Sequence, residues 1–283
     1  MTLLICHSLW GFQGDLAAAI QQARRHGFDG LEANLQHPII AGLEPAAIEE
    51  ALHQAGLALI LELVTGGDYV PALQLGPMEH LVELEQLLEQ AQALHPLRIS
   101  VIAGSDSWPL EQQHVFLERA VQLAAASTAP VCFETHRSRS LFNPWMIGTY
   151  LEAHPQLRLT ADLSHWCCVS ERLMEPDLAP VQAMADRVDH IHARVGHGQG
   201  PSVGHPFAPE WAEALAAHQR CWQLFLQAQR QRGHSPSTIT PEFGPDGYIP
   251  LLPFTGMPVA DLLEINSAMA RWIRGGALEP AAA

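Results

Sequence analysis

Acidic residues and histidines collect at the ends of short apolar runs from residue 134 onward. Four such runs carry Glu134 with His136, Asp162 with His165, His190 and His192 with Arg194, and Glu242. A carboxylate in a buried strand has a large desolvation cost unless it is paired or bound to a metal. Three carboxylates and one imidazole around one point would repel each other without a cation. The pattern therefore predicts a divalent metal site whose oxygen-rich ligands favour Mn²⁺, Mg²⁺ or Co²⁺ over a structural zinc.

Each of these residues also has an ordinary structural explanation. A single glutamate at the end of a strand is often a helix cap or an ion-pair partner. His190 is equally explained as a core histidine or as a group that orients a ligand, and His136 and His165 as hydrogen-bond partners. The metal hypothesis fails only if such explanations hold at once for all four members of one set. That set is Glu134, Asp162, His192 and Glu242.

Short apolar runs alternate with longer amphipathic segments along the whole chain. The apolar runs predict strands at residues 3–8, 29–33, 57–64, 98–103, 130–135, 157–163, 188–194 and 238–243. The amphipathic segments predict helices at residues 15–26, 44–55, 78–94, 110–126, 144–154, 179–187, 209–232 and 259–274. Eight strand–helix pairs are typical of an α/β protein with a (β/α)8 TIM barrel. We expect a single barrel domain over residues 1–274 and a frayed tail over residues 275–283.

A doubly wound open sheet is the alternative architecture, and it often has a glycine-rich first turn. Residues 10–14, after the first predicted strand, read WGFQG and lack a GxGxxG pattern. In a barrel the active site lies at the carboxyl ends of the strands. The early strands end near His7, Glu32 and Glu62. We therefore expect His7 and Glu62 to face substrate and Trp10 to stack on it, although core packing is the commoner role of such a tryptophan.

These residues resemble the xylose isomerase-like TIM barrel superfamily. The resemblance is carried by the motifs Glu134-Thr-His136, Asp162-Leu-Ser-His165, His190-Ile-His192 and Glu242, and by the segment GFDGLE at residues 27–32. It covers essentially the whole chain in order. The superfamily contains sugar isomerases and epimerases, inosose and dehydroshikimate dehydratases, and apurinic endonucleases of the endonuclease IV type. The motifs are moderately specific for the superfamily and poor guides to the substrate.

The resemblance implies a role for each matching residue. It implies that Glu134, Asp162, His192 and Glu242 hold a divalent metal, for which we expect Mn²⁺, with Mg²⁺, Co²⁺ or Zn²⁺ as alternatives. In the epimerase branch the two glutamates also act as acid and base on opposite faces of the substrate. His165, three residues after the aspartate, resembles a residue that holds a substrate oxygen.

The chain departs from the superfamily pattern after the seventh predicted strand. The family usually has an acidic residue three positions after the second histidine, where this chain has Val195. The epimerases place an arginine six positions after it, where this chain has Gly198. Arg194 shares the parity of His192 in the strand, so it is the candidate to bind substrate instead. The Asp-x-His pair of the endonuclease branch is also missing, because residues 204–206 read GHP.

Composition excludes several other activities. All 15 basic residues among the 283 are arginine, so no Schiff-base, pyridoxal-phosphate or P-loop lysine exists here. A net charge of −15 argues against binding to nucleic acid or to an anionic membrane. Five cysteines without CxxC spacing are typical of reduced thiols, and residues 1–10 lack the basic start of a signal peptide. We expect a cytoplasmic protein.

The predicted site and the resemblance together favour an enzyme that moves a proton next to a carbonyl. We expect a metal-dependent isomerase or epimerase of a small sugar or hydroxy-ketone, with proton transfer by glutamate through a metal-stabilised enediolate. A dehydratase of a cyclic polyol ketone, of the inosose or dehydroshikimate type, is the alternative, and a non-catalytic sugar-binding barrel is a third hypothesis. The absence of lysine favours an unphosphorylated polyol. A homo-oligomer is left open.

Overall fold

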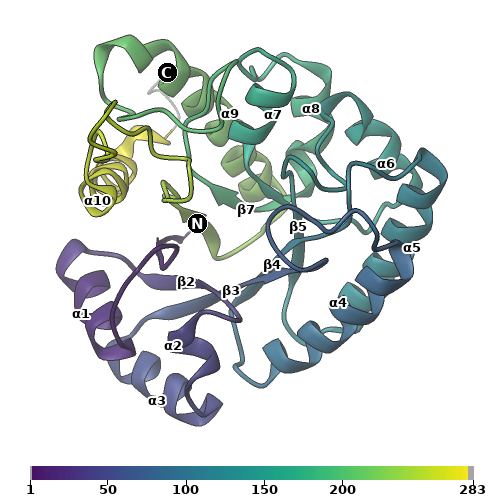
Figure 1. The fold of residues 1–283 in the computed structure, drawn as a ribbon, viewed down its shortest axis with the longest axis horizontal. Coiled ribbons are helices and arrows are strands. Elements are labelled where there is room, and N and C mark those ends of the chain that lie inside the picture. The colour runs from purple at the N-terminus through teal and green to yellow at the C-terminus, as the bar shows by residue number, and fades with distance from the viewer. Residues whose placement is uncertain (1, 280–283) are drawn as a thin grey trace.

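Eight short apolar segments form a closed parallel sheet in the computed structural model, which describes residues 2–279. The strands pair in chain order, and β8 pairs with β1 to close the barrel (Figure 1). They are β1 (Leu3–Ser8), β2 (Gly30–Asn34), β3 (Ala58–Val64), β4 (Arg98–Ile102), β5 (Val131–Glu134), β6 (Leu159–Ala161), β7 (Val188–His192) and β8 (Ser237–Thr240).

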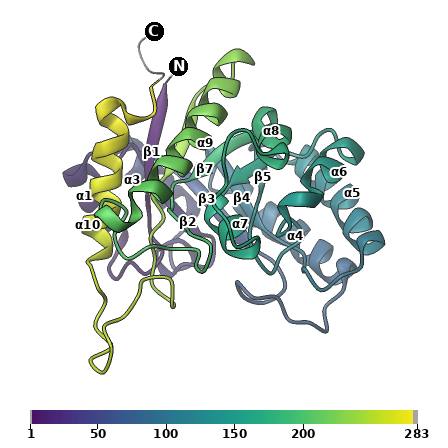
Figure 2. The same cartoon turned by 90° about the horizontal axis from the view of Figure 1, so that it is seen from above.

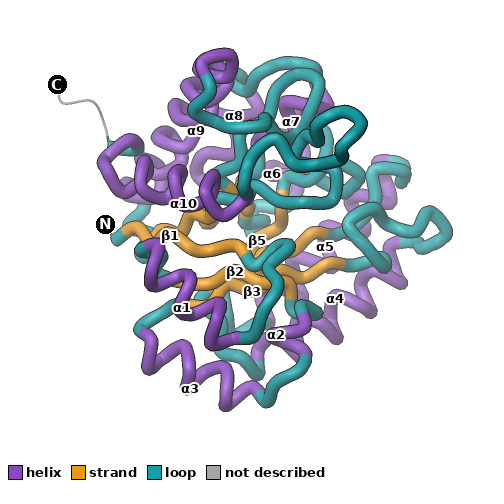
Figure 3. Tube along the Cα trace, turned by 60° about the vertical axis from the view of Figure 1, so that its left-hand side comes forward, coloured by secondary structure: helices purple, strands orange, loops and turns teal. Residues whose placement is uncertain are grey.

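Helices surround the sheet because the connections between neighbouring parallel strands run through them, and α10 follows the last strand (Figures 1 and 3). The α-helices are α1 (Leu16–His26), α2 (Pro38–Ala41), α3 (Pro45–Ala55), α4 (Pro77–Gln92), α5 (Leu110–Ala126), α6 (Ile147–Ala153), α7 (Leu163–Val169), α8 (Ala179–Met184), α9 (Ala212–Gln231) and α10 (Leu262–Trp272). Short 3₁₀ turns occupy Pro144–Met146, Ala185–Arg187 and Pro209–Trp211. Local signals fix the ends: Asp15 caps α1, and Gly27 ends it with a positive φ of 75°.

The predicted TIM barrel is confirmed, with strand bounds that differ from the expected ones by a few residues. The sixth strand is shorter than expected at both ends, and it ends at Ala161 because the side chain of Asp162 caps α7 by accepting from the Ser164 N–H. This helix was not predicted, and it carries His165.

The C-terminal segment corrects the expectation of a frayed tail from residue 275. Residues Ile273–Ala277 form a π-helical turn, and Leu278 is buried. The carbonyl of Ala277 accepts hydrogen bonds from Gln219 and Gln223 on α9. An apolar side chain and two amide donors therefore hold the chain in place through this stretch. The remainder of the expected tail, residues 280–283, lies outside the described residues.

The inside of the barrel is unusually polar. Ser100 on β4 and Thr160 on β6 join their hydroxyl groups across it at 2.8 Å. His190 on β7 is fully buried and contacts the Thr238 hydroxyl of β8 at 2.7 Å. Most TIM barrels fill this space with branched apolar side chains. The polar interior continues upward into the candidate site, so the site rests on a hydrogen-bonded base.

The longest loops emerge on the side of the barrel where the strands end (Figure 2). The segment 65–76 follows β3, and the segment 241–261 follows β8 and projects furthest. The two described chain ends lie on the opposite side. No helix within residues 2–279 is long and apolar enough to cross a membrane.

Candidate metal centre and pocket

Four side chains from four consecutive parts of the barrel converge at the carboxyl ends of the strands. Glu134 ends β5, Asp162 follows β6, His192 ends β7, and Glu242 follows β8. One potential ligand atom from each lies within 4.8 Å of those of the other three, and all four residues are buried. The structure thus brings together the four residues of the predicted metal set.

The backbone around Asp162 fixes the direction of its carboxylate. The hydroxyl of Thr135 donates to the Asp162 carbonyl and accepts from the Asp162 N–H, each at 2.9 Å. Oδ1 of the carboxylate accepts from the N–H and the hydroxyl of Ser164, at 2.9 and 2.5 Å. The other oxygen, Oδ2, faces the cluster, where it meets Arg194 at 2.5 Å. Local chain geometry therefore orients this side chain without help from the rest of the cluster.

The orientation of His192 is set by Glu32 on β2. The two oxygens of Glu32 lie 3.0 Å from His192 Nε2 and 3.1 Å from His190 Nε2, and all three residues are buried. A carboxylate at Nε2 places the proton there and leaves the lone pair of His192 on Nδ1. That atom lies 3.1 Å from Glu242 Oε2 and 3.5 Å from Glu134 Oε2.

Arg194 is a second source of positive charge at the cluster. Its buried guanidinium lies 2.5 Å from Asp162 Oδ2 and 3.2 Å from Glu242 Oε2. Burial alone would lower its pKa, but the nearby carboxylates of Asp162 and Glu242 raise it further above its ordinary value. Arg194 is therefore permanently charged and offsets one of the three carboxylate charges in the set.

The remaining polar atoms fit a divalent cation. Glu134 Oε2 and His192 Nδ1 are both buried and lack a hydrogen-bond partner among the described residues. Buried polar atoms in native proteins are nearly always satisfied, so two orphans that face the same point indicate a missing ligand. A divalent ion would take both atoms and balance the two carboxylate charges left over by Arg194. Three oxygen donors and one nitrogen suit Mn²⁺, Mg²⁺, Co²⁺ or Zn²⁺.

Mutual repulsion and burial shift the pKa values of this cluster. Burial raises the pKa of Glu134 to about 7, against the lowering effect of His192 and with help from Glu242. Burial would lower the pKa of His192, but the carboxylates of Glu242, Glu32 and Glu134 raise it well above its usual range. Without a metal the cluster therefore holds protons at neutral pH, and a bound cation would displace them.

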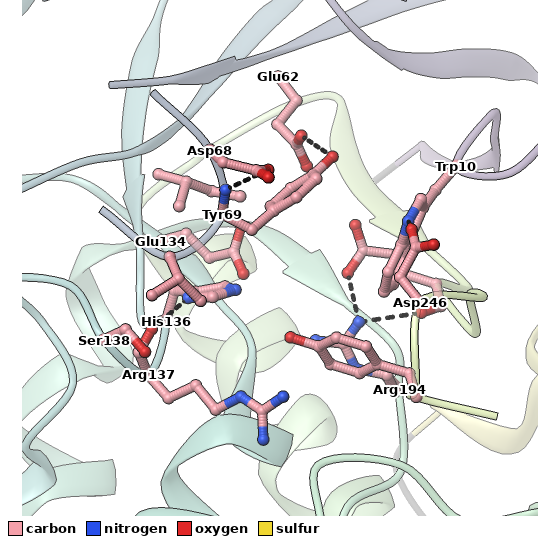
Figure 4. Close-up of a pocket in the computed structure, with 14 residues that line it drawn as sticks. Trp10, Glu62, Asp68, Tyr69, Glu134, His136, Arg137, Ser138, Arg194 and Asp246 are labelled. Carbon is pink, nitrogen blue, oxygen red and sulfur yellow. Dashed lines mark hydrogen bonds and ion pairs between the residues drawn. The ribbon is translucent and has the colours of Figure 1, made fainter. Parts of the chain in front are cut away.

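A pocket of about 500 Å³ opens above the cluster (Figure 4). The described residues that line it include Glu134 and Glu242 but not Asp162 or His192. The two glutamates therefore reach both the candidate metal position and the space for a small molecule. Arg194, Glu62 and Trp10, which were expected to bind substrate, also line the pocket.

Glu62 contributes a further carboxyl group to the wall of this pocket. Its Oε1 accepts from the Asn34 amide at 3.0 Å and from the Tyr69 hydroxyl at 2.9 Å. Burial and the carboxylates of Glu242 and Glu134 raise the pKa of Glu62 to about 8. Because both donors point at Oε1, a proton on Glu62 would be carried by Oε2.

Trp10 forms part of the rim of the pocket. Its indole N–H donates to Asp246 at 2.8 Å, and its ring meets the Tyr248 ring edge-on at 4.8 Å between centroids. Both partners belong to the long loop after β8. A Cβ atom on Gly244 of that loop would come within 2.0 Å of the Trp10 ring, so only glycine leaves room for the indole here.

Two of the expected substrate-binding residues lie elsewhere. His7 stacks on Phe28 at 4.9 Å and lies 3.0 Å from Gln22 of α1, so it faces the helices; the expectation that it contacts substrate is corrected. The reason is strand parity, because its neighbour Ser8 faces the barrel side. His165 lies under the pocket, where its Nε2 accepts from Arg194 at 2.8 Å and its ring packs on His136 at 3.9 Å.

Four other residues of the site had no predicted role. Glu32 was noted only as a strand end, although its position in the strand puts it on the side of β2 that faces the barrel interior. Tyr69, Arg137 and Tyr248 line the pocket from loops. Sequence periodicity gives no signal for the path of a loop, so only the GFDGLE segment at residues 27–32 offered a way to find any of them.

Comparisons with known proteins identify relatives of the fold only. No family model matches the chain, and no curated protein matches it. Among solved structures, the probable 3-DHS dehydratase AsbF from Bacillus anthracis is 16% identical over 97% of this chain and 99% of its own, with a TM-score of 0.64. D-psicose 3-epimerase from Clostridium cellulolyticum H10 is 14% identical over 98% and 100%, with a TM-score of 0.63.

A third structure similar to this chain is the IOLI protein with a binding zinc atom, which is 10% identical over 96% of this chain and 98% of its own, with a TM-score of 0.63. At such low identity these similarities concern the fold. They agree with the resemblance at that level, since a probable dehydratase, an epimerase and a zinc-binding protein share the barrel fold of this chain.

Proposed function

We propose that this protein is a metal-dependent isomerase or epimerase of a small sugar or hydroxy-ketone. The observation that carries the proposal is the position of Glu134 and Glu242, which belong to a tight cluster of four potential ligands and also line the pocket. The cluster would hold one divalent ion through Glu134, Asp162, His192 and Glu242. Epimerases among the solved structures with this fold support the same reaction class.

The metal would be Mn²⁺, because three carboxylates and one imidazole form an oxygen-rich set. Zinc is the alternative, since one structure of this fold contains it. When bound, the ion supplies Lewis acidity, which makes a proton next to a carbonyl easier to remove. Metal analysis of the purified protein distinguishes the two ions.

The protein's own groups then move the proton. Glu134 and Glu242 come from strands three positions apart in the barrel, so they approach the pocket from different sides. One glutamate removes the proton from the substrate carbon next to the carbonyl, and the other donates a proton to the opposite face of that carbon. Arg194 lines the pocket and donates to a substrate oxygen, while His165 positions Arg194 from below. Trp10 covers one face of the substrate.

Dehydration is the second candidate, and Glu62 is the observation that favours it. Loss of a hydroxyl group needs an acid that protonates the leaving oxygen. Glu62 lines the pocket, and burial is the first cause that raises its pKa to about 8, which suits it to donate such a proton. A dehydratase of similar fold supports this reading.

Solvent exchange tests the proposal. The Mn²⁺-loaded protein is incubated with a panel of ketoses in deuterated buffer, and NMR follows deuterium on carbon. Exchange should occur in the wild type and fall at least 100-fold in Glu134→Gln and Glu242→Gln, a loss typical of a missing general acid or base. Glu264→Gln, on α10, is the control and should leave the rate unchanged.

The products separate the two candidate reactions. An epimer or isomer supports the first, and an unsaturated or deoxy product supports the second. Each glutamine variant is also titrated with Mn²⁺, so that a lost proton transfer is distinguished from a lost metal. Exchange that continues undiminished in both metal-loaded variants would overturn the role of the glutamates.

A further inference from the structure

Arg137 is a charged group of the pocket that has no use in the proposed chemistry. It follows β5 by three residues and lines the pocket together with Arg194. Arg194 is neutralised by Asp162 and Glu242. No carboxylate of residues 2–279 lies within ion-pair distance of Arg137, and its guanidinium instead lies over the ring of Tyr248, at 4.9 Å from the centroid.

Tyr248 brings the two guanidinium groups of the pocket near each other. Arg194 lies 4.7 Å from the centroid of the same ring. Two positive charges beside one ring repel each other, and the electron-rich face of the tyrosine offsets only part of this cost. The nearby carboxylates contact Arg194, so half-buried Arg137 has Tyr248 as its partner and is open to an anion from outside the chain.

The loop that carries Arg137 is held rigidly. The next residue, Ser138, has a φ of 66°, and its carbonyl accepts from the Asp106 N–H at 3.2 Å. Arg139 is buried and donates to the carbonyls of Thr65 and Tyr69, at 2.5 and 3.1 Å, in the loop after β3. The backbone is therefore fixed before any ligand arrives, which reduces the entropy that binding would cost.

The position of Arg137 defines which part of a ligand it meets. Figure 4 shows its guanidinium on the opposite side of the pocket from Glu62, beyond His136 and Glu134. A substrate whose carbonyl lies at the glutamates would present its far end to Arg137. That end would carry the negative charge, away from the acidic side of the pocket.

We propose that the substrate carries a carboxylate at the end remote from its reacting carbonyl, and that Arg137 binds this group. The inference rests on the proposed function and narrows its substrate class to keto-acids of the sugar series. A guanidinium fork matches the two oxygens of a carboxylate. One free positive charge balances a carboxylate of one negative charge better than a phosphate of about −1.5 to −2. Asp68 and Asp246, which line the same pocket, disfavour the larger charge.

Matched substrates test the inference. The probes are D-fructuronate and D-tagaturonate, their neutral counterparts D-fructose and D-tagatose, and D-fructose 6-phosphate. Affinity is measured by calorimetry on the Mn²⁺-loaded protein, and carbon-bound deuterium exchange is measured in parallel. We expect an acid probe to bind more tightly than its neutral counterpart, and Arg137→Gln to weaken that binding about 10- to 100-fold, the range for a hydrogen bond to a charged group.

Controls separate the charge of Arg137 from other effects. Arg137→Gln should weaken binding of the acid far more than binding of its neutral counterpart, and Arg137→Lys should restore part of the affinity for the acid. Arg172→Gln is the matched control, because Arg172 also lies over an aromatic ring, that of Trp145 at 5.3 Å, but outside the pocket. It should bind every probe like the wild type.

The possible results distinguish this inference from the proposed function. Binding of an acid that depends on Arg137, without any exchange, supports the carboxylate site and counts against the enzyme. Exchange of a neutral ketose with no preference for the acid, and no effect of Arg137→Gln, supports the enzyme and overturns the carboxylate site. Tighter binding of the phosphate ester, or no binding of either acid, also overturns it.

Discussion

Glu32 holds the two histidines of β7, and its replacement by glutamine should weaken metal binding. Each of its oxygens lies within hydrogen-bond distance of an imidazole nitrogen, at 3.0 Å for His192 and 3.1 Å for His190. A glutamine has nearly the same volume but only one acceptor oxygen for two N–H donors. One imidazole therefore loses its partner, and the ring of His192 is no longer held in the orientation that points Nδ1 at the cluster.

The expected loss follows from the role of such partners in metal sites. Removing the group that orients a metal-bound histidine typically lowers affinity 10- to 100-fold, or about 1.4–2.7 kcal/mol. Glu32 is only 3% exposed, so water does not readily take its place. We expect a loss near the upper end of this range. Glu32 also helps to raise the pKa of His192, and its removal eases deprotonation of the ring, which offsets part of the loss.

Titration of the metal-free protein with Mn²⁺ against a competing chelator measures the effect at pH 7.5. Glu49→Gln is the matched control, since Glu49 also faces a histidine, His95 at 3.3 Å, but on the surface. It should bind Mn²⁺ like the wild type. Circular dichroism and urea unfolding establish that both variants fold. An unchanged Mn²⁺ affinity in folded Glu32→Gln would refute the arrangement argued here for His192.

Three further predictions concern stability and the shape of the pocket. Removal of the metal by EDTA should lower the thermal midpoint by several degrees, because a ligand at 100 times its Kd adds about 2.7 kcal/mol to the free energy of unfolding. Calorimetry should show that added Mn²⁺ restores the midpoint. Burial lowers the pKa of His218 to about 4. The unfolded chain takes up this proton near pH 6.5, so the free energy of unfolding should fall as the pH drops from 6.5 to 4. Urea unfolding should show that His218→Gln loses about 3 kcal/mol less than the wild type over this interval. Gly244→Ala should displace the Trp10 ring, cost about 1–3 kcal/mol, shift tryptophan fluorescence and raise the KM of any substrate.

Each of these has a result that would contradict it. A thermal midpoint insensitive to EDTA would mean that the cluster binds no metal tightly. Equal losses of stability in the wild type and His218→Gln would mean that another group governs the acid transition. Neutral His218 accepts from the Gly196 N–H at 3.3 Å, and a protonated ring could not accept this hydrogen bond. Unaltered fluorescence in Gly244→Ala would mean that the loop after β8 yields instead of the indole.

The barrel was predictable because its signals are local and repeated. Most strands are apolar runs of a few residues, and turn signals such as Asp15 and Gly27 mark the ends of the first helix. The four clustered residues were predictable for a different reason. A carboxylate such as Glu134 at the end of a buried strand conflicts with ordinary burial preferences, and the barrel brings all strand ends to one face. Their convergence follows from topology, whereas their role as ligands stays a prediction.

The remaining parts of the site depend on information that periodicity does not contain. His7 and Ser8 are both polar and both near the end of β1, and only the register of the closed sheet decides which faces the barrel interior. Tyr69 and Tyr248 reach the pocket from loops of 12 and more residues, whose paths are fixed by distant contacts such as those of Arg139. Helix α7 was missed because a strand of only three residues precedes it.

Arg194 connects the departures of this sequence to the chemistry of the site. It contacts Asp162 and Glu242, so two of the four potential ligands would share their charge between this guanidinium and a bound cation. Such sharing would weaken the binding of a metal but leave less negative charge beside the pocket. Arg137 adds a positive charge there, and among the described residues no carboxylate forms an ion pair with it. Both effects favour an anionic substrate over a neutral sugar. This chain has Gly198 where the epimerases place an arginine. We expect Arg194 and Arg137, which line the pocket, to supply that positive charge instead.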